Sequence, residues 1–164
     1  MPASLPVQRT LEALRKEGWT ADVAEKWVAI PGPNRCPSCG QARPRPGMPP
    51  GIRRDLHGFV DVDAFHPEKG HLYVQCSDDA GGMAKHVTKL LGEDLAPKVE
   101  RALRAGCRVE IHAWGKRGPR GKVKHWTRRR LVFTLVSALD GYGLPALSAT
   151  MVGPLAYFEQ EGAP

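Results

Sequence analysis

Two carboxylates and an amide are spaced as a metal-binding site requires. Asp61 and Asp63 lie in the run GFVDVDAF, residues 58–65, and Gln75 lies in the run HLYVQCS, residues 71–77. Alternate residues of a β-strand face the same side of a sheet, so the two carboxylates are expected together. If the two runs pair as a hairpin, the amide oxygen of Gln75 joins them, and such oxygen ligands suit a hard cation. The alternative is an edge hairpin whose carboxylates face solvent.

Positive charge is concentrated in the second half of the chain. The formal net charge is +7, and residues 98–130 contain twelve Lys or Arg, with Glu100 and Glu110 as their only acids. The acid-free stretch 35–54 adds five arginines. Such clusters indicate a polyanionic partner, because neutralising phosphates releases counterions; a solvated surface is the alternative. The residues expected to contact DNA phosphates are Arg53, Arg54, Lys116, Arg117, Arg120, Lys122, Lys124 and Arg128.

A basic turn lies between two tryptophans. Trp114 and Trp126 flank the segment GKRGPRGKVKH, which is expected to form the tip of a hairpin. Such a tip fits a groove of DNA, and a flanking tryptophan can stack on an unpaired base. The alternative is that both rings close the hydrophobic core.

The CPSCG motif is half of a structural zinc site. Cys36 and Cys39 have the spacing of a zinc-binding pair, but a closed Zn²⁺ site needs about four ligands. The residues that could complete it are Cys76, Cys107, His57, His66 and His71, or ligands from a second copy of the chain. Two turn cysteines without a metal are the alternative.

Periodicity predicts a mixture of helices and strands. Helical spacing predicts a helix over 5–17, and alternation predicts a strand over 21–30, with a short helix capped by Thr20 as the alternative. Residues 31–52 are rich in Pro and Gly and predict a loop. The other expected elements are the hairpin strands 58–65 and 71–77, a helix capped at Ser77, Asp78 or Asp79, a helix from Pro97 to Gly106, and strands 107–114 and 123–136. No clear element is predicted from Ser137.

These elements predict an α/β (α+β) fold with a mixed central sheet of about four to five strands flanked by helices. One domain is expected over residues 1–136, with the CxxC pair in the loop 31–52, and residues 137–164 form a C-terminal extension. The sequence has four cysteines, no secretion signal and no apolar run of the roughly 18 residues that a membrane span needs. We therefore expect a soluble protein without a membrane partner, in the cytoplasm of a bacterium, an archaeon or a phage-infected host.

The run RRDLHGFVDVDAF followed by HLYVQCS and a basic helix resembles the PD-(D/E)XK nucleases, in particular relatives of archaeal Holliday-junction resolvases and phage endonucleases. The resemblance covers roughly residues 7–134 and implies a restriction-endonuclease-like fold. In that family an Asp on the first hairpin strand and the acidic residue of an ExK motif on the second bind Mg²⁺, and the Lys orients the attacking water. By position Asp61 matches the first carboxylate, and Gln75 and Ser77 stand where the Glu and Lys of ExK would be.

Two departures from the family pattern follow from Gln75 and Ser77. Gln is neutral, so Asp63, Asp55 or Glu25 would have to supply the second negative charge. Lys85 or Lys89, which are four residues apart and share one helix face, would have to replace the missing Lys. Phosphate contacts by these two lysines are the alternative.

The resemblance implies a metal-dependent DNA endonuclease acting in repair, recombination or phage DNA processing, and it allows selectivity for branched DNA such as a Holliday junction. A homodimer is expected, because a four-way junction presents two symmetric strands. The competing hypothesis is a catalytically degenerate nuclease-fold protein that only binds DNA. An RNA-binding module of another fold has weaker support, from the basic hairpin alone.

Overall fold

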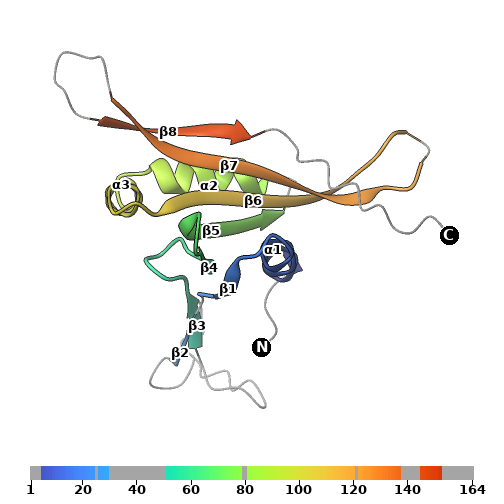
Figure 1. Ribbon diagram of the computed structural model, residues 1–164, viewed down its shortest axis with the longest axis horizontal. Helices are drawn as coiled ribbons and strands as arrows, with labels where there is room; N and C mark the ends of the chain where they lie inside the picture. Colours follow the sequence, from blue (N-terminus) through green and yellow to red (C-terminus); the bar gives the residue numbers. More distant parts are fainter. Residues whose placement is uncertain are drawn as a thin grey trace, which may run out of the picture.

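The computed structural model describes residues 5–24, 26–29, 51–78, 81–120, 122–137 and 145–152. Within these ranges it contains three helices, a six-stranded sheet and a separate two-stranded sheet (Figure 1). None of the helices in the described ranges is long and apolar enough to cross a membrane.

The six-stranded sheet is mixed. Neighbouring strands are antiparallel except for the central pair β5 and β6, which is parallel. A parallel pair needs a crossover connection, and the two helices α2 and α3 provide it. The α+β class with a mixed sheet is thus confirmed, although the sheet has more strands than expected. In spatial order its strands are β1 (Thr20–Val23), β4 (Val62–His66), β5 (Gly70–Asp78), β6 (Arg108–Arg117), β7 (His125–Ser137) and β8 (Pro145–Val152).

Helices cover both faces of the sheet. α1 (Leu5–Lys16) confirms the expected first helix and packs on one face, while α2 (Gly82–Leu91) and α3 (Ala96–Arg104) pack on the other. Along β5, Leu72, Val74 and Cys76 face α1 and belong to its core. The intervening Tyr73, Gln75 and Ser77 therefore point toward the α2 and α3 side.

The expected strand over residues 21–30 is wrong in its extent, because two strands of different sheets occupy it. β1 pairs with β4, whereas β2 (Lys26–Ala29) pairs with β3 (Gly51–Arg54). The Ala24 amide donates to the Asp61 carbonyl at 2.8 Å, where the chain leaves the main sheet. The expected loop also loses Gly51 and Ile52 to β3.

Two further expectations are corrected at the ends of elements. The residues after Ser137 include β8, which pairs with β7 along its whole length, although its small and polar residues gave no clear pattern. The expected caps Ser77 and Asp78 belong to β5 instead, and α2 begins after Gly81, whose φ of 84° suits glycine. Asp79 lies outside the described residues.

Candidate active site

Asp61 and Gln75 meet across the β4–β5 hairpin. Asp61 directly precedes β4, and its amide donates to the Val74 carbonyl at 3.0 Å. The Gln75 side-chain Nε2 donates to Asp61 Oδ2, and the Cys76 amide donates to the same oxygen at 2.7 Å. Asp61 is 5 % exposed and Gln75 is 4 % exposed. The structure thus brings together the two residues that the hairpin was expected to align.

The donor atoms of this pair fit a hard cation. The Oε1 atom of Gln75 is buried and has no hydrogen-bond partner among the residues that the structure describes. An unsatisfied buried carbonyl oxygen is costly, and a cation beside the Asp61 carboxylate would satisfy it. Across the described ranges no group of three or more His, Cys, Asp or Glu side chains is placed to hold a metal. Asp61 and Gln75 would therefore bind a cation together with water and substrate oxygens.

Ser77 supplies no ammonium group, and a role of Lys85 or Lys89 beside Asp61 stays a prediction. Ser77 is buried, and its hydroxyl donates to the Asp78 carbonyl at 2.6 Å. On α2, the Lys89 ammonium lies 3.4 Å from the Asp55 carboxylate, while Lys85 is exposed. Asp55 and Lys89 thus form an ion pair with each other.

His86 is a residue of this region that the sequence did not single out. It is half-buried on α2, and its Nδ1 atom is buried without a hydrogen-bond partner in the described part of the chain. Burial lowers the pKa of His86 and so does Lys89, whereas Asp55 and Asp78 oppose the shift. The imidazole is therefore mostly neutral at pH 7. Its helical spacing from Met83 and Leu90, the buried residues of α2, could have identified His86 from the sequence.

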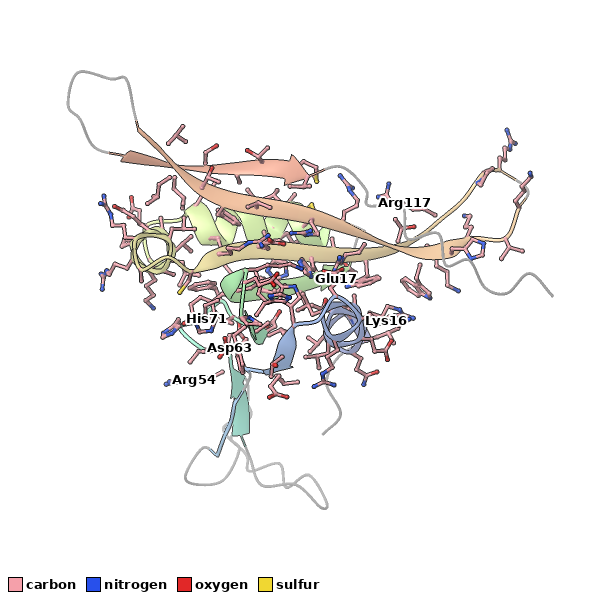
Figure 2. The ribbon with its side chains drawn as sticks, in the orientation of Figure 1. Lys16, Glu17, Arg54, Asp63, His71 and Arg117 are labelled. Carbon is pink, nitrogen blue, oxygen red and sulfur yellow. The ribbon has the colours of Figure 1, made fainter. Side chains whose placement is uncertain are left out.

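Asp63 has a different side-chain partner from Asp61. Its carboxylate contacts the His71 imidazole on the neighbouring strand, and Figure 2 shows the two side chains beside each other. Burial raises the pKa of the Cys107 thiol, and the charge of Asp63 adds to that rise. The contact with His71 involves one carboxylate oxygen of Asp63, and the expectation that Asp63 shares a cation with Asp61 and Gln75 stays a prediction.

The basic hairpin forms an exposed arm. β6 and β7 pair as far as Arg117 and His125, and Figure 1 shows this end of the hairpin reaching beyond the helices. Trp126 is 39 % exposed, and the Arg9 guanidinium carbon lies 3.6 Å from its ring centroid. Trp114 instead donates its indole N–H to the Thr10 hydroxyl at 2.9 Å, so it joins the arm to α1. The exposed cations of this basic arm are Lys116, Arg117, Arg120, Lys122 and Lys124.

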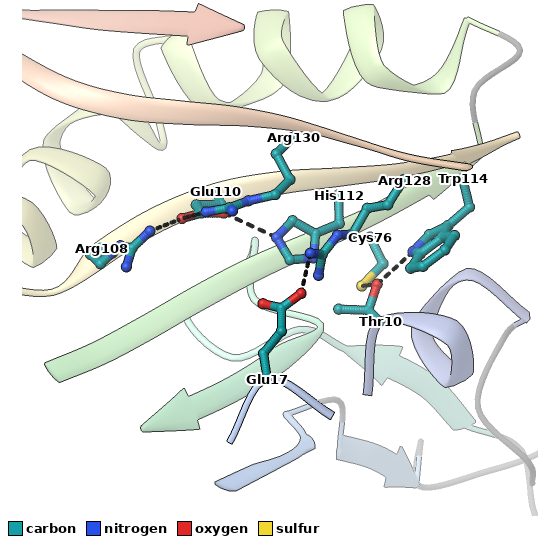
Figure 3. Close-up of polar contacts among 9 residues, drawn as sticks. All are labelled: Thr10, Glu17, Cys76, Arg108, Glu110, His112, Trp114, Arg128 and Arg130. Carbon is teal, nitrogen blue, oxygen red and sulfur yellow. Dashed lines mark hydrogen bonds and ion pairs between the residues drawn. The ribbon is translucent and has the colours of Figure 1, made fainter. Parts of the chain in front are cut away.

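Arg128 was expected to contact DNA phosphates, but its side chain is buried. Its side chain is 1 % exposed and its guanidinium donates to Glu17, which directly follows α1, so it lies inside the protein (Figure 3). Arg54 is exposed at the end of β3 (Figure 2). Of the residues expected at the sites, Glu25, Cys36, Cys39 and Arg53 have side chains outside the described part. The zinc hypothesis for Cys36 and Cys39 therefore stays a prediction.

A buried polar network lies on the α1 side of β6 and β7 (Figure 3). Glu110 is fully buried and accepts hydrogen bonds from Arg108, Arg130 and His112. Burial would raise the pKa of Glu110, but the bonds from His112 and Arg130 lower it far below its ordinary value. Burial lowers the pKa of His112, which outweighs the opposing bond to Glu110. Glu110 is therefore ionised and His112 neutral in the folded protein.

No family model matches the chain, and no solved structure matches it significantly. The function must therefore be inferred from the residues of this chain. Those that bear on it are the buried Asp61 and Gln75 pair and the basic arm.

Proposed function

We propose that this protein is a metal-dependent DNA endonuclease of the PD-(D/E)XK type. The observation that carries the proposal is the buried contact between Asp61 and Gln75, with a Gln75 carbonyl oxygen that lacks a partner among the described residues. An Asp and an amide oxygen at matched positions of a hairpin correspond to the metal-binding positions that the resemblance implies.

The order of the elements supports the same proposal. α1 is followed by the antiparallel strands β1, β4 and β5, then by α2 and α3, and then by β6 parallel to β5. This order is the one implied by the resemblance. Asp61 stands at the start of the second of these strands and Gln75 within the third.

In the proposed reaction, the chain supplies positioned ligands and phosphate contacts. A bound Mg²⁺ or Mn²⁺ would polarise the phosphoryl oxygen and lower the pKa of water. The Cys76 amide and the Gln75 side chain orient the Asp61 carboxylate by donating hydrogen bonds to it. The Gln75 carbonyl oxygen, which has no hydrogen-bond partner among the described residues, is available to such a cation.

The basic arm supplies the DNA-binding surface of the proposal. A two-stranded β-ribbon fits the major groove, and exposed Lys and Arg side chains contact phosphates whatever the sequence. Trp126, exposed beside Arg9, offers a ring on which an unpaired base of branched DNA can stack. A homodimer remains part of this proposal, since it would match the two-fold symmetry of a four-way junction.

The test is a cleavage assay on end-labelled duplex, flap, single-stranded and four-way junction DNA. We expect cleavage when Mg²⁺ or Mn²⁺ is added and none when EDTA is present. Sedimentation of the protein with a junction measures the stoichiometry, for which the proposal expects two chains.

A second function, DNA binding without catalysis, is favoured by one observation. The position of the family Lys holds Ser77, which is buried and bonded to the Asp78 carbonyl. If every substrate binds and none is cleaved with either metal, the binding-only function replaces the nuclease.

A further inference from the structure

A pocket of about 170 Å³ lies on the α1 side of the sheet, away from Asp61 and Gln75. Its apolar wall comes from the end of α1, where Leu14 and Trp19 meet Leu72 of β5. Glu110 and His112 of β6 are fully buried among its lining residues. Its remaining lining residues are Glu17, Lys69, Arg108 and Arg130.

The pocket holds more positive than negative charge. Lys69, Arg108 and Arg130 line it with two carboxylates, Glu17 and Glu110. One of these, Glu17, also accepts a bond from the buried Arg128. Three cations thus line the pocket with two carboxylates, and one of these carboxylates is shared with Arg128. Partly buried charges are costly unless a counter-charge accompanies them, and their mutual repulsion is screened less than at the surface.

The two guanidinium groups are fixed in place by one carboxylate. Glu110 Oε1 accepts from Arg108 Nη2 and Arg130 Nη2, each at 2.7 Å. Glu110 Oε2 accepts from Arg130 Nε at 2.8 Å and lies 3.0 Å from His112 Nε2. A carboxylate offers about four acceptor positions, so Glu110 has none left for a further cation.

Donors remain on both arginines. A guanidinium carries five N–H groups, and the bonds to Glu110 use one of Arg108 and two of Arg130. Neither guanidinium has another hydrogen bond within the described ranges. The Arg108 side chain is 38 % exposed and that of Arg130 is 18 % exposed, so a ligand can reach them from the pocket. Fixed guanidinium forks recognise phosphate well, because little rotamer freedom is lost on binding.

We propose that this pocket is a phosphate-binding site in which Arg108 and Arg130 hold the phosphate group and Lys69 adds charge at the rim. The net positive charge of the lining residues favours an anionic group such as a phosphate monoester. Such a group is carried by inorganic phosphate, by a nucleotide and by a phosphorylated DNA end. The site lies on the other face of the sheet from Asp61 and Gln75, and it does not depend on nuclease activity.

The proposal is tested by calorimetric titration of the whole chain with inorganic phosphate, in EDTA and at constant ionic strength. We expect saturable binding that Arg108→Gln weakens by about tenfold or more, since hydrogen bonds to charged groups contribute roughly 1.5–3 kcal/mol. Arg104→Gln is the matched control, because Arg104 is an exposed arginine of α3 paired with Glu100, and it should bind like the wild type. Circular dichroism establishes that each variant is folded.

Lys69→Gln keeps the proposal testable if Arg108→Gln does not fold, because Lys69 is exposed and is not among the bonded partners of Glu110. It should weaken phosphate binding severalfold. Titration with a nucleoside monophosphate, and with one oligonucleotide carrying either a 5′-phosphate or a 5′-hydroxyl, identifies the source of the phosphate. Absence of saturable phosphate binding by the wild type, or unchanged affinity in the folded pocket variants, overturns the proposal. Either result leaves the metal-dependent cleavage assay unaffected.

Discussion

Gln75 lowers the negative charge of the Asp61 site, because an amide stands where a second carboxylate would repel the first. Its Nε2 group donates to the buried Asp61 carboxylate, so the site without a cation contains one charge that two donors satisfy. A Glu at this position would put two carboxylates in contact in a buried place, and one of them would be protonated or the pair would repel. The neutral amide therefore reduces the dependence of the folded state on a cation, and it also lowers the charge available to bind one.

Gln75→Glu should make the stability of the protein depend on metal. Without a divalent ion, we expect the free energy of unfolding to fall by roughly 1–3 kcal/mol, because a hydrogen bond is replaced by a buried carboxylate. Addition of Mg²⁺ or Mn²⁺ should recover much of this decrease. Urea unfolding with and without metal measures it, and Gln75→Met is the control that should be destabilised without recovery. Equal responses to metal in Gln75→Glu and Gln75→Met would contradict the assignment of this position.

The sequence predicted the pairing of Asp61 with Gln75 because period-two alternation and hairpin pairing are local rules. The same rules placed Asp63 beside Asp61, and the partner that engages Asp63 was not visible. In the register of β4 with β5, Asp63 is opposite Tyr73, and His71 reaches its carboxylate diagonally from the position opposite Phe65. The burial of Arg128 was hidden for a similar reason, since its partner Glu17 is 111 positions away in the sequence.

At the scale of elements, the basic arm is where the structure adds most to the charge pattern. β7 has 13 residues and β6 has 10, and the paired ends of both extend past the part of the sheet that α1 covers (Figure 1). The cations near its tip are exposed, while at its base Trp114 bonds Thr10 of α1 and Arg128 bonds Glu17, the residue after α1. A hairpin that is fixed at its base and exposed at its tip is suited to insert into a groove of DNA.

Replacing the lysines near the tip should weaken DNA binding in a salt-dependent way. In Lys122→Gln/Lys124→Gln the expected change is a lower affinity at low salt and a salt slope reduced by about one unit for each phosphate that the variant no longer neutralises. Fluorescence anisotropy of labelled duplex and junction DNA at several salt concentrations measures both. Arg104→Gln removes one charge from α3 and should change the slope less. A double variant with the wild-type slope would place the DNA elsewhere on the protein.

Elements with strong periodicity were predicted well, and those defined by their partners were not. α1, the β4–β5 hairpin and the long strands β6 and β7 follow patterns within one segment. The break at Ala24 is set by its bond to the Asp61 carbonyl, which no alternation pattern reveals. β8 carries few β-branched residues and becomes a strand because β7 presents an edge to pair with.

At the scale of the whole molecule, the sheet separates two polar regions. Asp61, Gln75 and His86 lie on the side of α2 and α3, whereas Glu110 and His112 lie under α1. Each region contains a buried histidine nitrogen without a partner among the described residues. The histidines of both regions are neutral in the folded state, because burial lowers their pKa.

This distribution predicts that stability falls in acid in two stages. Below pH 6.5, the ordinary pKa of His, unfolded chains take up protons that folded His112 and His86 resist, so the free energy of unfolding decreases. Below pH 4.5, the ordinary pKa of Glu110, the same argument adds a further decrease, because the folded carboxylate stays ionised. Each such group contributes up to about 1.4 kcal/mol per pH unit within its window.

Urea unfolding from pH 8 to below pH 3 measures both stages of this dependence. His112→Gln should flatten the part just below pH 6.5, although it lowers the stability overall by removing a buried group from the Glu110 network. A free energy of unfolding that stays constant or increases as the pH falls from 6.5 to 5 would contradict the neutral state of these histidines.

Metal-dependent cleavage by Asp61→Asn and Asp63→Asn, compared with the wild type on one labelled four-way junction, tests the proposed function most directly. Asn keeps the shape of Asp and removes the charge that a divalent ion needs. We expect Asp61→Asn to abolish cleavage in Mn²⁺ while DNA affinity stays the same or rises, because a negative charge beside the phosphate is removed. Asp63→Asn should keep cleaving, since Asp63 pairs with His71. Cleavage by Asp61→Asn at the wild-type rate, or its absence in Asp63→Asn alone, would contradict an active site built on Asp61 and Gln75.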